Sequence, residues 1–267
     1  MDLLRPDLLA LAWGLTAALM VALWLVQQRT RDAGIVDVGW TGGLGLSAAT
    51  LAAFADAPLE RRLLVAGLAG AWSLRLAIYL YFDRVHGREH EDGRYQAIRA
   101  SWGAAAPWKF FLFFQAQALS VAILAIPYAV AITNPRGELG LPDWIGAGLL
   151  AAAVLGESAA DRTLARFRAD PANRGRTCRE GLWRYSRHPN YFFEWLQWWA
   201  WVPMAWGSPI AWASLGSPAV MLWFILKVTG IPPTEARALV TRGDDYREYQ
   251  RTTSAFIPWF PRGRAAA

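Results

Sequence analysis

The sequence predicts an all-α polytopic membrane protein with seven transmembrane helices, forming one integral membrane domain of residues 1–267 with its N-terminus outside and its C-terminus in the cytoplasm. The composition is too apolar for an ordinary soluble domain, because 55% of the residues are hydrophobic and 16 are tryptophan. Long apolar segments recur along the chain, and the basic residues gather on one side of them.

Seven apolar segments approach the roughly 20 residues that a helix needs to cross the hydrocarbon core of a bilayer. They cover residues 8–26, 34–54, 63–82, 108–132, 144–160, 191–206 and 209–229. The first segment lacks the charged start and the small-residue cleavage pattern of a signal peptide, so we expect it to remain as a helix. No internal repeat and no linker divides the chain, which favours a single domain.

The orientation follows from the distribution of basic residues. If the N-terminus is outside, the outer segments hold only a few of them: Arg5, Arg61, Arg62 and Arg136. Most of the others then face the cytoplasm, as the positive-inside rule requires. Topology also accounts for the net charge of +6, so we expect membrane lipids and not nucleic acid as partners.

The sequence gives no sign of a metal site or of a common nucleotide-binding motif. A single cysteine, Cys178, excludes a disulfide framework, and the three histidines are scattered over two loops. Neither a G-x-G-x-x-G fingerprint nor a P-loop is present. Any nucleotide would therefore be held by the helices and their loops.

Residues 176–201 combine basic and apolar chemistry most abruptly. Four arginines and a histidine lead into a tryptophan-rich segment, namely Arg176, Arg179, Arg184, Arg187 and His188. Pro189 suits the first turn of a helix, and Asn190 and Glu194 follow one turn apart on one face. Polar groups inside a membrane segment are costly and usually functional. Arginines beside a helix N-terminus suit an anionic ligand such as a phosphate.

Upstream of this segment, Asp161 and Arg168 lie on the same face of a helix that continues from the fifth apolar segment. The two side chains suit the ribose and phosphate parts of a nucleotide. They equally suit an ordinary surface ion pair, and their spacing alone leaves both interpretations open.

A second polar group opens the second apolar segment, where Asp37 and Trp40 share a helical face near its cytoplasmic end. The neighbouring Gly39, Gly42 and Gly43 would let another helix or a ligand approach closely. The alternative is structural, with Asp37 at the positive end of the helix dipole and the glycines used for helix packing.

The third apolar segment carries Arg75 and Tyr79 one turn apart at membrane depth. An arginine inside the membrane needs a carboxylate or a ligand, and Asp37 and Glu194 are the carboxylates that we consider for it. Tyr79 is a candidate proton donor, because its hydroxyl would lie next to a cation. The alternative is a tyrosine of the interfacial aromatic belt.

Several of these segments resemble a known family. The stretches GLWRYSRHPNYFFEWLQWW and YREYQRTTSAFIPW resemble the C-terminal half of the steroid 5-alpha-reductase-like family, and IVDVGW, WSLRLAIYL and EDGRY resemble its uncharacterised bacterial branch. The resemblance implies a seven-helix reductase of the bacterial inner membrane. Such an enzyme binds NADPH from the cytoplasmic side and reduces an activated carbon–carbon double bond in a lipid-like, sterol-like or isoprenoid-like substrate.

The resemblance also implies roles for individual residues. By position, the cofactor contacts fall on Asp161, Arg168, Arg176, Asn190, Glu194, Arg88 and Tyr246. The Gln-Glu pair that meets the steroid carbonyl in the steroid reductases is absent, and Asp37 and Trp40 stand in its segment, so a steroid is not implied. We expect hydride transfer to an enone whose carbonyl is held by Tyr79 or Asp37, with Trp40 and Arg75 near the substrate.

Two other classes of function remain open. Isoprenylcysteine carboxyl methyltransferases also have an RHPxY segment followed by a glutamate, and PPTEARAL resembles their C-terminal helix, which would make Glu235 a contact of S-adenosylmethionine. That cofactor has no phosphate, so the arginines favour NADPH. A non-enzymatic transporter or scaffold would need a polar path through the membrane, whereas the ionisable residues here crowd one face.

Overall fold

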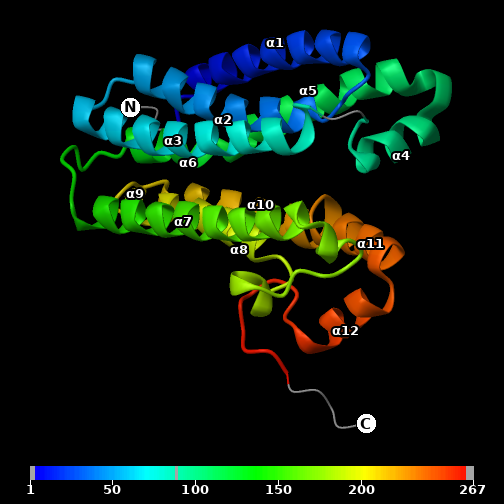
Figure 1. Ribbon diagram of the computed structural model, residues 1–267. Helices are drawn as coiled ribbons and strands as arrows, with labels where there is room; N and C mark the ends of the chain where they lie inside the picture. Colours follow the sequence, from blue (N-terminus) through cyan, green and yellow to red (C-terminus); the bar gives the residue numbers. More distant parts are fainter. Residues whose placement is uncertain (1–3, 88–89, 263–267) are drawn as a thin grey trace. The chain divides into compact units, whose positions relative to one another are not determined.

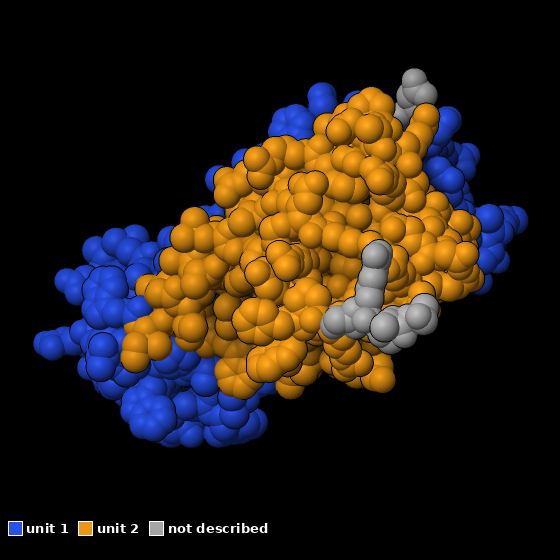
Figure 2. Space-filling view, turned by 60° about the horizontal axis from the view of Figure 1, so that its bottom comes forward, with its two compact units in different colours: residues 1–144, 201–217 blue, residues 145–200, 218–267 orange. Residues whose placement is uncertain are grey.

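The computed structural model of the protein describes residues 4–87 and 90–262, so the predicted cofactor contact Arg88 lies outside the described residues. The chain forms two compact units, coloured separately in Figure 2. Unit 1 comprises Met1–Trp144 and Trp201–Ser217, and unit 2 comprises Ile145–Ala200 and Pro218–Ala267. The chain passes from one unit to the other within or directly next to helices. The prediction of a single domain stays a prediction.

Unit 1 contains four long or medium helices that run alongside one another, together with shorter elements (Figure 1). Its elements are α1 (Pro6–Thr30), α2 (Ile35–Phe54), α3 (Leu59–Arg84), α4 (Gly93–Trp102), η1 (Gly103–Ala105), α5 (Ala106–Leu124), α6 (Ile126–Ile132), α9 (Trp201–Met204) and η4 (Ala211–Leu215). Helix α2 packs against α1, α3 and α5 and is therefore central to the unit.

Small residues allow this close packing of α2. A Cβ added at Gly39 would lie 2.3 Å from Cδ1 of Leu23, and one at Gly43 would lie 2.7 Å from Cγ2 of Thr16. Both contacts are with α1, so the helix-packing interpretation of these two glycines is the one that the structure supports. A Cβ at Gly42 would meet nothing within 4 Å.

A buried ion pair joins the start of α3 to the start of α7 (Leu141–Ala169) inside unit 1. Arg61 donates to Asp143 through Nη1 at 2.8 Å and Nη2 at 3.3 Å, and each side chain is only 1% exposed. The remaining guanidinium hydrogens reach backbone carbonyls, including that of Glu138 at 2.8 Å, and Arg136 also donates to Asp143 at 3.2 Å. Arg61, which the orientation argument counts only as a charge of an outer segment, is thus part of the buried core.

Unit 2 contains most of α7, which the chain enters from unit 1, and the elements that follow Ala169 apart from α9 and η4. They are η2 (Pro171–Asn173), η3 (Gly181–Arg184), α8 (Pro189–Trp199), α10 (Gly216–Trp223), the π-helical η5 (Phe224–Val228), α11 (Ile231–Arg242) and α12 (Asp244–Thr252). Helix α8 begins at Pro189, as the sequence predicts.

Helices α7 and α8 pack tightly, because a Cβ on Gly156 would lie 2.4 Å from the ring of Phe193. The indole of Trp195 binds α8 to the carbonyl of Pro218 in α10 at 3.0 Å. The C-terminal segment returns to the loop before α8, where Ser254 forms an isolated bridge with Ser186. The described residues form no strand beyond this bridge.

Four helical segments are long and apolar enough to cross a membrane: Pro6–Thr30, Leu59–Arg84, Gly93–Ile132 and Ala211–Arg242. The all-helical prediction is therefore confirmed for the described residues, and the four candidate spans agree with the predicted membrane protein. The other three predicted segments are helical as well, but α2 is rich in glycine, α7 carries several charges and α8 has only 11 residues. The number of seven spans and the orientation stay predictions.

We predict that Arg61→Met destabilises the protein by about 3–5 kcal/mol, because it leaves the Asp143 carboxylate buried and short of a partner. The measurement is thermal unfolding of the detergent-solubilised protein, followed by tryptophan fluorescence. Arg61→Met combined with Asp143→Leu should recover part of the loss, since no buried charge then remains in that pair. A single variant as stable as the wild type would show that the pair does not stabilise the unit.

Candidate functional site

The first polar group of the candidate site lies where α7 meets the start of α8 in unit 2. Nδ2 of Asn190 donates to Oδ1 of Asp161 at 3.4 Å, and Asp161 is only 3% exposed. Oδ1 of Asn190 is buried and has no hydrogen-bond partner among the described residues. Two of the predicted cofactor contacts are thus neighbours, although 29 positions separate them in the sequence.

Glu194 lies one turn after Asn190 in α8 and is partly buried. Arg168 lies near the end of α7, so it shares that helix with Asp161 as predicted, and its side chain is exposed. Arg176 is exposed in the loop after η2. The structure therefore places these predicted contacts on α7, on α8 and in the segment between them.

The arginines of the loop before α8 have different uses. Arg179 donates to Asp245 of α12 at 2.9 Å and lies 3.7 Å from Glu248. Arg187 is paired with Glu235 of α11 at 2.6 Å, whereas Arg184 is exposed like Arg176. Arg179 and Arg187, two of the four predicted arginines, thus pair with carboxylates of α12 and α11.

Glu235, which has no role in the predicted reductase, is the centre of a cluster that contains one predicted cofactor contact, Tyr246. Its Oε1 accepts from Arg187, lies 3.2 Å from Nε2 of His188 and accepts from the hydroxyl of Tyr246 at 3.3 Å. Its Oε2 accepts from Gln250 at 2.8 Å. The cluster joins α11, α12 and the residues just before α8. No local sequence signal could have shown it, because His188 and Glu235 are 47 positions apart.

The surroundings of the cluster determine the protonation of two members. Burial lowers the pKa of His188 below its ordinary value of 6.5, although the neighbouring Glu235 opposes this shift. Its ring stacks on that of Tyr191, with centroids 5.3 Å apart and planes at 5°. Burial, followed by the charge of Glu235, raises the pKa of Tyr246, so its hydroxyl stays protonated and can donate.

Two further arginines place positive charge beside this cluster. Arg242, the last residue of α11, lies with its guanidinium 5.6 Å from the ring centroid of Tyr246. The charge of Arg168 acts on Arg242, and both act on the thiol of Cys178. Like charges held near each other favour an anion in their vicinity.

Asp37 forms a second polar group, in unit 1. It lies in the first turn of α2 and accepts from Arg84 of α3, from Arg94 of α4 at 3.2 Å and from the hydroxyl of Tyr95 at 2.7 Å. Both carboxylate oxygens are therefore occupied by donors. The geometry fits the helix-start interpretation, with Asp37 also holding α3 and α4 to α2.

The other predicted catalytic and substrate residues also lie in unit 1. The indole of Trp40 donates to the hydroxyl of Ser120 at 3.0 Å, which joins α2 to α5. Arg75 and Tyr79 lie one turn apart in α3, as predicted, and both are partly buried. Their roles in substrate binding and proton donation stay predictions.

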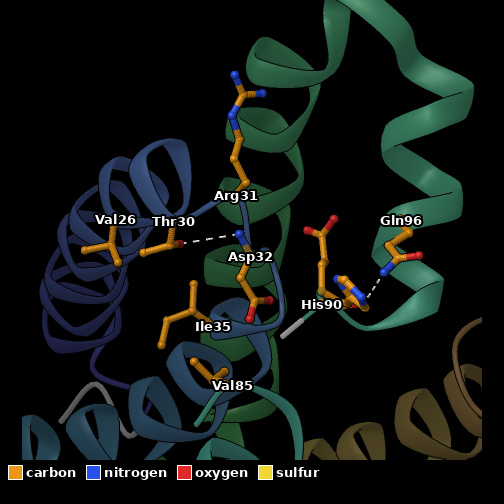
Figure 3. Close-up of a pocket in the computed structure, with 9 residues that line it drawn as sticks. Val26, Thr30, Arg31, Asp32, Ile35, Val85, His90 and Gln96 are labelled. Atoms are coloured by element: carbon orange, nitrogen blue, oxygen red, sulfur yellow. Dashed lines mark hydrogen bonds between the residues drawn. The ribbon is translucent and has the colours of Figure 1, made fainter. Parts of the chain in front are cut away.

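A pocket of about 450 Å³ opens at the turn between α1 and α2, beside the residues that precede α4 (Figure 3). Apolar and polar side chains line it, namely Val26, Thr30, Arg31, Asp32, Ile35, Val85, His90, Glu91 and Gln96. Figure 3 shows Arg31 directed away from Asp32. Burial raises the pKa of Asp32. None of the predicted site residues that the structure describes lines this pocket.

Comparison with known proteins places the chain in a family. Residues 23–253 match the model of the family described as "Protein of unknown function (DUF1295)". The chain belongs to this family. An uncharacterized protein of Schizosaccharomyces pombe, C594.04c, is 26% identical to this DUF1295 member over 277 aligned positions, which cover 88% of the chain and 75% of the yeast protein. No solved structure matches the chain.

The lowered pKa of His188 predicts a pH dependence of stability for this DUF1295 member. Below pH 6.5 the unfolded state binds a proton that the buried ring resists, so stability should fall as the pH is lowered from 6.5 towards the folded-state pKa. Melting temperatures in detergent between pH 7.5 and about pH 5 would measure this. His188→Gln should flatten the curve, and His86→Gln, at an exposed position, should not. Equal pH dependence in all three proteins would contradict the assignment.

Proposed function

We propose that the protein is an NADPH-dependent membrane reductase of the steroid 5-alpha-reductase-like type. It transfers a hydride to the activated double bond of an enone in a lipid-like substrate. In this proposal the protein crosses a bacterial inner membrane seven times. Its N-terminus lies outside, and its cofactor site opens to the cytoplasm. Its support consists of the family resemblance of residues 181–199 and 246–259, together with the polar groups around the start of α8.

The observation that carries the proposal is the contact of Asp161 with Asn190. Oδ1 of Asn190 is buried beside this contact without a hydrogen-bond partner among the described residues, and a buried amide oxygen in that state is costly unless a ligand donates to it. A ribose hydroxyl can donate to this oxygen. Arg168, Arg242 and the exposed Arg176 supply positive charge for phosphates in the same unit. The residues present therefore fit an NADPH molecule.

The predicted site residues would bind NADPH, orient it or donate a proton. NADPH, when bound, supplies the hydride. Asp161 and Asn190 would hold its ribose, Arg168 and Arg176 its phosphates, and Glu194 would complete the binding surface. Tyr79 is the proposed proton donor, because its phenol can donate a hydrogen bond to a carbonyl oxygen and so stabilise an enolate. The oxygens of Asp37 already accept from three side chains, which favours Tyr79 as the donor.

The methyltransferase alternative would use Glu235 as a cofactor contact. Glu235 accepts hydrogen bonds from Arg187, Tyr246 and Gln250 and also contacts His188, which favours a bracing role for this carboxylate. S-adenosylmethionine also has no phosphate for Arg168 and Arg242 to bind. These two points favour the reductase.

We predict that NADPH raises the melting temperature of the detergent-solubilised protein and that Asn190→Ala removes most of this shift. A ligand that binds only the folded state stabilises it in proportion to its affinity. Loss of one hydrogen bond to a ribose hydroxyl should weaken binding by about tenfold, which corresponds to about 1.4 kcal/mol. Asn173→Ala changes a partly buried asparagine at the end of η2 and should leave the shift intact.

The same measurement with S-adenosylmethionine separates the alternatives. Stabilisation by S-adenosylmethionine and not by NADPH would replace the reductase with the methyltransferase. Stabilisation by neither ligand would remove both enzymatic proposals. Equal NADPH shifts in the wild type and in Asn190→Ala would contradict the assignment of Asn190 alone.

A further inference from the structure

Helix α8 carries a third polar side chain, Gln197, whose role the proposed function does not define. Asn190, Glu194 and Gln197 follow one another at spacings of four and three residues, so they lie on one face of the helix. Gln197 is two turns beyond Asn190, about 10 Å further along α8. The face that begins with the contact to Asp161 therefore stays polar into the tryptophan-rich part of the helix.

The burial of Gln197 is unusual because its amide makes no hydrogen bond. The residue is 0% exposed, and neither Nε2 nor Oε1 has a hydrogen-bond partner among the described residues. A buried amide without partners destabilises a protein, and native structures rarely leave one in that state. An ordinary packing role would be served better by leucine, which has a similar size and no polar atoms.

The other buried amides of the described chain differ from Gln197. Asn134, 2% exposed, donates to the carbonyls of Met204 and Trp206 and accepts from the backbone of Arg136. Gln27, also fully buried, accepts from Arg99 through its Oε1, whereas its Nε2 has no partner in the described chain. Gln197 is the buried amide whose two polar atoms both lack partners within residues 4–87 and 90–262.

We propose that Gln197 binds the carboxamide of the nicotinamide ring and thereby fixes the orientation of that ring. The inference rests on the proposed function. A side-chain amide presents one donor group and one acceptor, and a primary carboxamide presents the same two groups in a complementary arrangement. The carbonyl oxygen of an enone can only accept. The position of Gln197 agrees, since a ribose held by Asn190 leaves the nicotinamide to extend along α8.

Three ligands test this inference by equilibrium binding to the solubilised protein. NADPH has the carboxamide, its 3-acetylpyridine analogue carries a methyl ketone in that place, and 2′-phospho-ADP-ribose has no nicotinamide at all. The wild type should bind NADPH about tenfold more tightly than the acetylpyridine analogue, because the ketone cannot donate to Oε1. Gln197→Leu should bind these two ligands alike and should bind 2′-phospho-ADP-ribose as the wild type does.

A second readout does not involve the cofactor. Gln197→Leu removes a buried amide that lacks partners, so the ligand-free variant should melt at a higher temperature than the wild type. A structural role for the amide predicts a lower melting temperature. Gln96→Leu, at an exposed position of α4, controls for the effect of adding a leucine and should not change the preference among the ligands.

The outcomes separate this inference from the proposed function. If all three ligands bind and the wild type does not distinguish NADPH from its acetylpyridine analogue, the role of Gln197 is refuted and the reductase assignment stands. If Gln197→Leu still prefers NADPH to its acetylpyridine analogue, the role of Gln197 is likewise refuted and the reductase assignment stands. If none of the three ligands binds, the proposed function fails and the role of Gln197 fails with it.

Discussion

The structure depends on one constraint: polar groups buried among apolar helices need hydrogen-bond or ion-pair partners, because burial without them is costly. Arg61 and Asp143 find these partners in a bidentate ion pair and in several backbone carbonyls. Glu235 satisfies this constraint through contacts with four side chains, and Asp37 through three. Each of these groups joins segments that are distant in the sequence, so polar contacts hold together the elements within each unit.

The same constraint distinguishes structural polar groups from candidate ligand contacts. Asp37 and Glu235 have their hydrogen-bonding capacity occupied by the protein itself. Oδ1 of Asn190 and both polar atoms of Gln197 are buried without partners in the described chain, and both residues lie on one face of α8. Such atoms lower the stability of the ligand-free protein. A polar ligand that binds along that face would supply the missing hydrogen bonds, as we propose.

Local sequence patterns predicted the helices and part of the candidate site. Proline geometry correctly predicted that α8 begins at Pro189, and helical periodicity correctly placed Asp161 and Arg168 on α7. The resemblance names Asp161 and Asn190 as cofactor contacts, and the structure brings the two side chains together, although their role stays a prediction. The two local predictions succeeded because each depends on neighbours within a few turns of one helix.

Long-range pairing could not be predicted in the same way. Counting charges assigned Arg61 and Arg136 to outer loops, but it could not show that both bind Asp143. The arginines before α8 suggested a phosphate cluster, whereas Arg179 and Arg187 pair with carboxylates of α12 and α11. Sequence analysis did not single out Gln197, which lies in an apolar segment. Only the packed structure shows that its amide lacks partners.

Energy transfer from tryptophan to the cofactor would show directly whether unit 2 binds NADPH along α8, as we propose. Trp195, Trp198 and Trp199 lie on this helix, so bound NADPH would be close to several donors. We expect a saturable sensitised emission of NADPH that 2′-phospho-ADP-ribose abolishes and S-adenosylmethionine does not. Absence of saturable transfer in the folded, solubilised protein, or its loss on addition of S-adenosylmethionine, would show that NADPH does not bind along this helix.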